Sequence, residues 1–293
     1  MALDRFKLLY DFQSLNLKDY FTLNPNLTPE QIDLLYNAGA DKENLARYSK
    51  LTKEQFMRFL NERGFDKDYL ALNPHLTPVQ IDLLYQTKGV NKDHLASTPK
   101  LTKEQFMRLF NNDSVDKDYL AMNSDLTPEQ IDLLYQTQGV DKEYLAGFPK
   151  LTKEQFMRLF NNDSVDKDYL SSNPNLTPEQ IDLLYQIEGL DKSDLAQYPK
   201  LTNEQFMRFF NDEDFDKDFL AQNPHLTTEQ IDLLYQIEGL DKDHLASNPK
   251  LTDEQFLRLF NDGFVDNDYL APNPSINPPA NKPFASGVFN WRW

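Results

Sequence analysis

A 20-residue segment occurs twice in this chain without a single change, and it limits what the chain can fold into. It reads LTKEQFMRLFNNDSVDKDYL over 101–120 and again over 151–170. Looser copies begin at Leu51, Leu201 and Leu251. A sister segment close to LTPEQIDLLYQ begins at Leu27, Leu76, Leu126, Leu176 and Leu226. The chain therefore repeats a 25-residue unit in two alternating versions, A for the sister segment and B for the first, which is typical of a solenoid.

Each unit predicts a helix followed by a shorter second element. Thr77 and its equivalents are helix N-caps, and the glutamine three residues later completes a capping box. Apolar residues at the sixth, ninth and tenth positions of the unit then form one stripe on a helix of about three turns. The second element, such as 116–121, has room for one or two turns of α or 3₁₀ helix capped by its leading aspartate. We expect its leucine and its aromatic residue to point inward.

The repeat predicts an all-α fold, a solenoid of about ten stacked units with no β-sheet. Residues 1–26 read as a truncated N-terminal capping unit and 27–271 as the solenoid. Residues 272–293 read as an extended, proline-rich tail with an aromatic C-terminus.

Three dipeptides mark the units: Leu70-Ala71, Asn73-Pro74 and Thr77-Pro78. With these markers the chain resembles the leucine-rich repeat variant family. It departs from that family by one extra residue at Leu76 and its equivalents, and by the lack of cysteine for the iron–sulfur module of some members. The resemblance implies a right-handed α-solenoid of alternating α and 3₁₀ helices with an interaction role, and it transfers no catalytic residue.

Composition narrows the classes of partner. With 40% hydrophobic and 13% aromatic residues, the chain is too apolar for a disordered acidic protein. A net charge of −17 argues against binding to nucleic acid or to anionic membranes, so we expect a protein partner or self-association. The N-terminal sequence lacks a secretory signal, and no apolar run could span a bilayer. We therefore expect a cytoplasmic protein, and a place in a virion stays possible.

No motif predicts chemistry. Without cysteine there is no thiolate metal site and no thiol nucleophile. Asp116 and Asp118 resemble part of a calcium loop, but the glycine and glutamate that an EF-hand requires are missing, so helix capping is the favoured interpretation. The four histidines show no metal spacing, and no phosphate loop or nucleophile motif occurs. We expect no enzyme activity, no metal and no cofactor.

The eighth position of the unit distinguishes the two versions. It lies nearly opposite the apolar stripe and holds arginine in B units. In A units it holds the outer leucines, which are Leu34, Leu83, Leu133, Leu183 and Leu233. Either A and B helices form antiparallel hairpins that enclose these leucines, or the leucines form an apolar ridge that docks a partner or another copy. We also expect the aspartate at the seventh position of A units to face the B-unit arginine in a ladder of ion pairs.

Two further groups of residues are candidates for binding. Aromatic side chains occupy a variable loop position at Tyr48, Phe148 and Tyr198, where local packing is the alternative. The tail carries Phe284, Phe289, Trp291 and Trp293, which either cover the open end of the last unit or insert into a partner. The sequence thus favours a non-enzymatic interaction scaffold that uses its surface or its tail. A structural subunit of a virion, filament or surface array is the alternative.

Overall fold

The computed structural model describes residues 22–246, 248 and 250–262, and every regular element in that part of the chain is a helix. The A units contribute the long helices α3 (Pro29–Asn37), α7 (Pro78–Gln86), α11 (Pro128–Gln136), α15 (Pro178–Tyr185) and α19 (Thr228–Tyr235). The B units contribute α5 (Lys53–Asn61), α9 (Lys103–Phe110), α13 (Lys153–Phe160), α17 (Asn203–Asn211) and α21 (Asp253–Asn261). Between them lie the short helices α4 (Lys42–Tyr48), α6 (Asp68–Ala71), α8 (Lys92–Ala96), α10 (Lys117–Ala121), α12 (Lys142–Gly147), α14 (Lys167–Ser171), α16 (Ser193–Gln197), α18 (Asp218–Ala221) and α20 (Asp243–Ala246).

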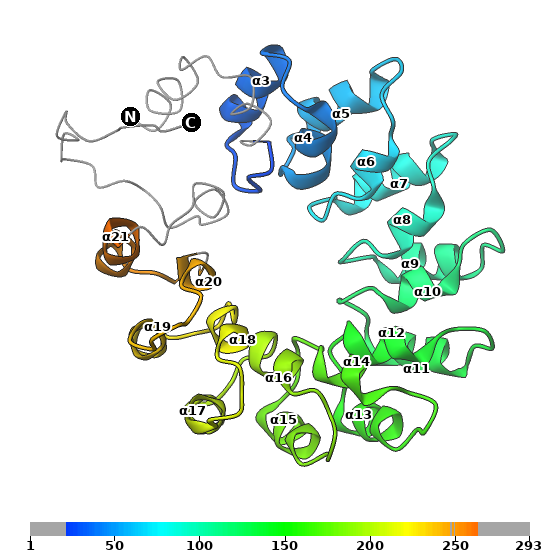
Figure 1. The fold of residues 1–293 in the computed structure, drawn as a ribbon. Helices are drawn as coiled ribbons and strands as arrows, with labels where there is room; N and C mark the ends of the chain where they lie inside the picture. The colour runs from blue at the N-terminus through cyan, green and yellow to red at the C-terminus, as the bar shows by residue number, and fades with distance from the viewer. Residues whose placement is uncertain (1–21, 247, 249, 263–293) are drawn as a thin grey trace, which may run out of the picture.

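The units stack into a curved array. Figure 1 shows an open arc with the long helices along its outer side and the short helices along its inner side, most clearly from α11 to α21. Successive short helices, such as α12 and α14, approach one another more closely than successive long helices do, as expected on the inside of a curve. The predicted all-α solenoid is therefore confirmed.

The ends of the long helices follow the sequence signals. Thr152 accepts a hydrogen bond from the N–H of Gln155, whose side chain accepts from the N–H of Thr152, so the capping box is complete. After α11 the chain reverses at Gly139, whose φ of 87° favours glycine. Lys142 then donates to the carbonyls of Thr137 and Val140, which the ending helix leaves available.

The core lies between the two layers of helices. Each long helix from α3 to α19 buries the sixth and ninth residues of its unit, such as Ile131 and Leu134, and each short helix buries two adjacent residues, such as Leu145 and Ala146. All four side chains are fully buried. One apolar core therefore runs along the whole arc, and each unit adds one layer to it.

A buried asparagine after the short helix of each of the first four B units ties that unit to the one before. Asn173 is 1% exposed, and its Nδ2 donates to the carbonyls of Ala146 at 2.7 Å and Pro149 at 3.0 Å. Its Oδ1 accepts from the N–H of Asn175 at 2.9 Å. The same ladder includes Asn73, Asn123 and Asn223. The sequence predicted only a turn at Asn-Pro, and the structure adds a link between units.

Two expectations about the units need revision, and a third lies mostly outside the described residues. The short elements are α-helical, so the 3₁₀ alternative is wrong for those described. Their leucines point inward as expected, and Tyr69, Tyr119, Tyr144 and Phe219 beside them are partly buried against the core, but Tyr169 is exposed. Of the predicted capping unit only 22–26 is described, and it forms turns. The right-handed sense of the winding stays a prediction.

Candidate functional site

The short helices present rows of side chains to the inside of the arc. In α14, Leu170 and Ser171 are buried against the long helices. At 100° per residue, Asp168, Tyr169 and Ser172 lie on the opposite face of the helix. Because the short helices line the inner side of the arc, that face is the concave surface of the solenoid (Figure 1).

The first row consists of carboxylates, which also link the units. The Oδ1 atom of Asp118 accepts from the N–H of Asp141 at 2.8 Å, and that of Asp93 accepts from the N–H of Asp116 at 2.9 Å. The row contains Glu43, Asp68, Asp93, Asp118, Glu143, Asp168, Asp218 and Asp243. The concave surface is therefore acidic along the N-terminal ends of its helices. The aspartates two residues earlier, such as Asp116, cap these helices as predicted.

The second row consists mainly of aromatic rings. It contains Tyr69, His94, Tyr119, Tyr144, Tyr169, Phe219 and His244, with Asn44 and Asp194 at the same position in two units. Tyr169 is the most open of its tyrosines, with 39% of the residue exposed. Its neighbour Gly147 has no side chain to cover it, and a Cβ there would lie 4.0 Å from Cδ1 of Tyr169.

Two further exposed aromatic residues lie at the C-terminal ends of short helices. Phe148 and Tyr198 follow α12 and α16 and are 42% and 40% exposed. The ring of Phe148 lies 6.4 Å from that of Tyr144. The equivalent residues Thr98 and Asn248 are buried and Tyr48 is partly buried, so only Phe148 and Tyr198 turn outward at this position of the A units. We call Tyr144, Phe148, Asp168, Tyr169, Asp194 and Tyr198 the aromatic–acidic patch.

The carboxylates of this patch lie in an unfavourable environment for their charge. Burial raises the pKa of Asp194, and the neighbouring charges of Asp191 and Asp168 raise it further. Burial likewise raises the pKa of Asp168, together with the charges of Asp166 and Asp191. Within the described chain, no ion pair joins Asp168 or Asp194 to a lysine or arginine. The patch therefore carries negative potential that a cation would relieve.

The outer leucines lie on the long helices, away from the aromatic–acidic patch. Leu83, Leu183 and Leu233 are 37%, 39% and 36% exposed, and Leu34 and Leu133 are more covered. The enclosing hairpins are not seen, because each A helix reaches the next B helix through a short helix of the inner layer (Figure 1). The leucines form neither a buried layer nor a fully exposed ridge.

The contacts between successive long helices explain why leucine alternates with arginine. Arg158 donates to Asp132 of the preceding A unit at 2.6 Å, which confirms the predicted ladder. The other pairs are Arg58–Asp33, Arg108–Asp82, Arg208–Asp182 and Arg258–Asp232. The same 26-residue register pairs Leu133 with Met107 of the preceding B unit, and both side chains are partly buried against the core. The A-to-B junctions are thus polar, and the B-to-A junctions are apolar.

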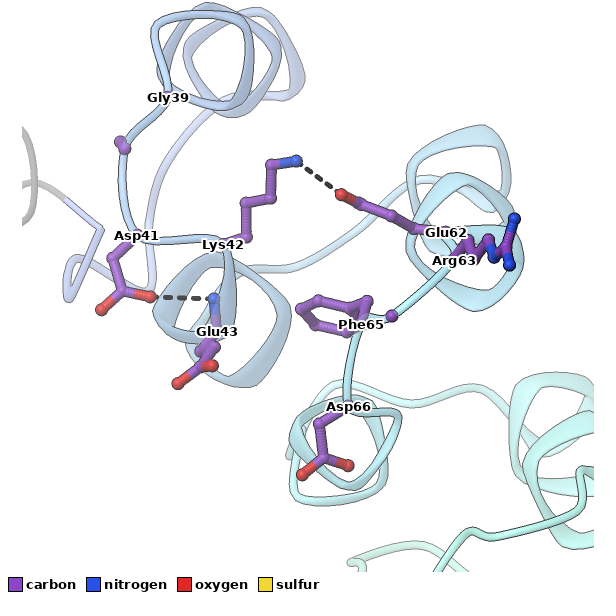
Figure 2. Close-up of a pocket in the computed structure, with 10 residues that line it drawn as sticks. Gly39, Asp41, Lys42, Glu43, Glu62, Arg63, Phe65 and Asp66 are labelled. Atoms are coloured by element: carbon purple, nitrogen blue, oxygen red, sulfur yellow. Dashed lines mark hydrogen bonds and ion pairs between the residues drawn. The ribbon is translucent and has the colours of Figure 1, made fainter.

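A shallow hollow near the N-terminal end of the array is filled by an ion pair. Figure 2 shows Lys42 and Glu62 pointing toward each other, and Nζ lies 2.5 Å from Oε1. Tyr36 donates to the other oxygen of Glu62 at 2.7 Å. The loop before Lys42 is one residue shorter than in later A units, so this lysine reaches Glu62 where Lys142 reaches loop carbonyls. The hollow is a structural variant of the repeat.

Other candidate sites are not supported by the described residues. The predicted tail residues, Phe284, Phe289, Trp291 and Trp293, lie outside them. Within the described residues no group of histidine, aspartate and glutamate side chains could hold a metal ion, and no helix is long and apolar enough to cross a membrane. The chain matches no family model, no curated protein and no solved structure.

Sequence reasoning missed the exposure of Tyr169 because it expected every aromatic residue at this position of the short helices to point inward. A signal was present, since the position before the buried Leu-Ala pair varies among tyrosine, histidine, phenylalanine, asparagine and aspartate. A position that accepts aspartate and phenylalanine in turn is unlike the invariant core positions beside it.

Proposed function

We propose that the chain is a non-enzymatic interaction scaffold that binds a protein partner through the concave surface of its solenoid. The observation that carries this proposal is the exposure of three large aromatic residues, Phe148, Tyr169 and Tyr198, in or directly after consecutive short helices of the inner layer. Large aromatic side chains supply much of the binding energy at protein interfaces, and clustered exposure of such residues marks interaction sites. A curved array that is long relative to its thickness also offers an extended concave surface. The resemblance to leucine-rich repeat variants agrees with an interaction role, and a place in the cytoplasm is part of the proposal.

A capture experiment with matched variants tests the scaffold. The full chain is immobilised, and the proteins it retains are compared with those retained by Phe148→Ser/Tyr169→Ser/Tyr198→Ser and by Leu83→Ser/Leu183→Ser. We expect the first variant to lose the retained proteins and the second to keep them. Equal retention by all three chains would contradict binding through the concave surface.

A structural subunit of a larger assembly is the second candidate. It is favoured by the outer leucines, which recur every 50 residues or so along the outer side of the arc and remain partly exposed. Light scattering over a concentration series tests it, because a subunit that assembles through this row grows in mass with concentration. A monomer at the highest concentration would count against assembly.

A further inference from the structure

The aromatic–acidic patch combines two features that together define a class of ligand. Phe148, Tyr169 and Tyr198 are exposed aromatic residues, and Asp168 and Asp194 carry carboxylates that lie close enough to repel each other. A guanidinium group can stack on an aromatic ring and donate to a carboxylate at the same time. We infer that the patch binds an extended, arginine-rich segment of a partner protein, with one arginine side chain beside Asp194. This inference rests on the proposed function and specifies the partner.

Asp194 is the residue of the patch beside which a bound cation would be most favourable. It replaces an aromatic residue of the second row, between Tyr169 of α14 and Phe219 of α18. Asp168 and Asp191 lie near enough to oppose its ionisation. An arginine placed there would offset the charges of Asp168, Asp191 and Asp194.

The lysines of these units do not form ion pairs with Asp168 or Asp194. Lys167 donates to the carbonyls of Asn162 and Val165, and Lys192 lies over the ring of Tyr185 with Nζ 4.4 Å from the centroid. Both therefore point toward the long helices. Lys150 and Lys200 follow the C-terminal ends of α12 and α16, opposite the carboxylate row. The acidic edge of the concave surface is left for a cation from another molecule.

The spacing of the units favours an extended partner. Neighbouring helices in packed arrays lie about 8–10 Å apart. A polyproline II segment advances roughly 9 Å per turn of three residues, so one turn spans about one unit. An arginine at every third position would then meet successive units along the row. The net charge of −17 adds long-range attraction for such a segment.

Fluorescence anisotropy with a labelled synthetic peptide, (Arg-Pro-Pro)₅, tests the inference on the full chain. The variants are Tyr169→Ala and Asp194→Asn. Glu179→Gln is the matched control, because it removes one exposed charge from α15 on the outer layer of the same unit. We expect saturable binding by the unchanged chain, weakening by about fivefold or more in both patch variants, and less than about twofold in the control. The acidic peptide (Glu-Pro-Pro)₅ is expected not to bind.

Melting followed by circular dichroism separates binding from folding, because Asp194→Asn removes an unfavourably placed charge and is expected to keep or raise the melting temperature. Absence of saturable peptide binding would overturn the inference, as would equal weakening in Asp194→Asn and Glu179→Gln. If the peptide does not bind while Phe148→Ser/Tyr169→Ser/Tyr198→Ser still loses the captured proteins, the scaffold proposal stands. The inference of an arginine-rich partner is then refuted. If the peptide binds to the patch while capture shows no dependence on the concave surface, the scaffold proposal falls instead.

Discussion

Arg158 on α13 donates from Nη2 to Oδ1 of Asp132 on α11, 2.6 Å away, and its guanidinium carbon lies 4.0 Å from the centroid of the Tyr135 ring. Gln155 donates to the same carboxylate oxygen at 3.0 Å and to the carbonyl of Pro128 at 2.8 Å. Each B helix is thus held to the preceding A helix by a polar clamp, which consists in this unit of Gln155, Arg158, Asp132 and Tyr135. The clamp recurs at every A-to-B junction described.

The ion pair of the clamp is expected to contribute modestly to stability. Asp132 and Arg158 are both more than one third exposed, so water and salt weaken their attraction. We expect a double-mutant cycle of Asp132→Asn and Arg158→Gln in urea unfolding to give a coupling of about 0.5–1 kcal/mol, reduced in high salt. A coupling indistinguishable from zero at low salt would show that the pair forms without stabilising the fold.

The glutamine of the clamp is expected to matter more than its counterpart in an A unit. Gln155 and Gln180 both complete capping boxes, but Gln155 also reaches the preceding unit. We expect Gln155→Ala to lower the free energy of unfolding by about 1–2 kcal/mol more than Gln180→Ala, because the carbonyl of Pro128 and the carboxylate of Asp132 lose a donor. Equal losses in urea titrations would assign the whole effect to capping.

The asparagine ladder is expected to be a main source of cohesion between units. Asn173→Ala leaves two buried carbonyls without their donor, and we expect a loss of about 2–4 kcal/mol in urea unfolding. Asn175→Ala is the control, because this residue lies in the same turn but its side-chain hydrogen bond, to the carbonyl of Phe148, is exposed to water, so its loss should cost less than about 1 kcal/mol. Similar losses in the two variants would contradict the ladder.

The carboxylates of the clamp and of the aromatic–acidic patch are expected to respond to acid in opposite directions. Hydrogen bonds from Gln155 and Arg158 lower the pKa of Asp132, so its stabilisation is present above pH 3.8 and is lost as pH falls through the lower folded value. The pKa of Asp194 is raised, so its charge destabilises the fold at neutral pH, and the penalty disappears as pH falls below its folded value toward 3.8.

Urea unfolding at pH 7 and near pH 3 checks this pair. At pH 7, Asp132→Asn should be less stable than the unchanged chain and Asp194→Asn as stable or more so. Both differences should shrink near pH 3. A difference for Asp194→Asn that grows in acid would refute the proposed environment of that carboxylate.

The outer leucines are expected to stabilise the apolar junctions within one chain. Leu183→Ser should cost about 1 kcal/mol, because the side chain is only partly covered, whereas Leu184→Ser in the core should cost at least about 3 kcal/mol. Sedimentation should show the same mass for Leu183→Ser and the unchanged chain. A larger unchanged species that dissociates on substitution would instead assign the leucines to an interface between copies.

Much of the unit was predictable because its signals are local. The cap at Thr152, the stripe that includes Phe156 and the stop near Gly139 each depend on a few neighbouring residues. The ladder of Asp132 and Arg158 was also predictable. Helical spacing places each residue on the same side of its own helix, and the helices repeat along the chain. The links made by Asn173 could not be read in the same way, since they depend on how one unit stacks on the previous one.

The concave surface was unpredictable for a related reason. Tyr169 occupies the same position of the repeat as Tyr119, which is partly buried against the core, yet Tyr169 is exposed. The openness of this ring depends in turn on Gly147, 22 positions earlier in the sequence. Such a pairing appears only once neighbouring units are in place.

The alternation of polar and apolar junctions sets how this chain can change length. Removing or inserting a single unit would join two units of the same version. Two B units would place an arginine against a methionine, and two A units would place a leucine against an aspartate. In either case a charge would lose its counterpart. Removing or inserting two units restores every junction. The identical segments at 101–120 and 151–170 lie one such double step apart, as recombination between copies would produce. Shortened or lengthened relatives of this array are therefore expected to differ by even numbers of units, and an engineered chain that loses 25 residues should fold less well than one that loses 50.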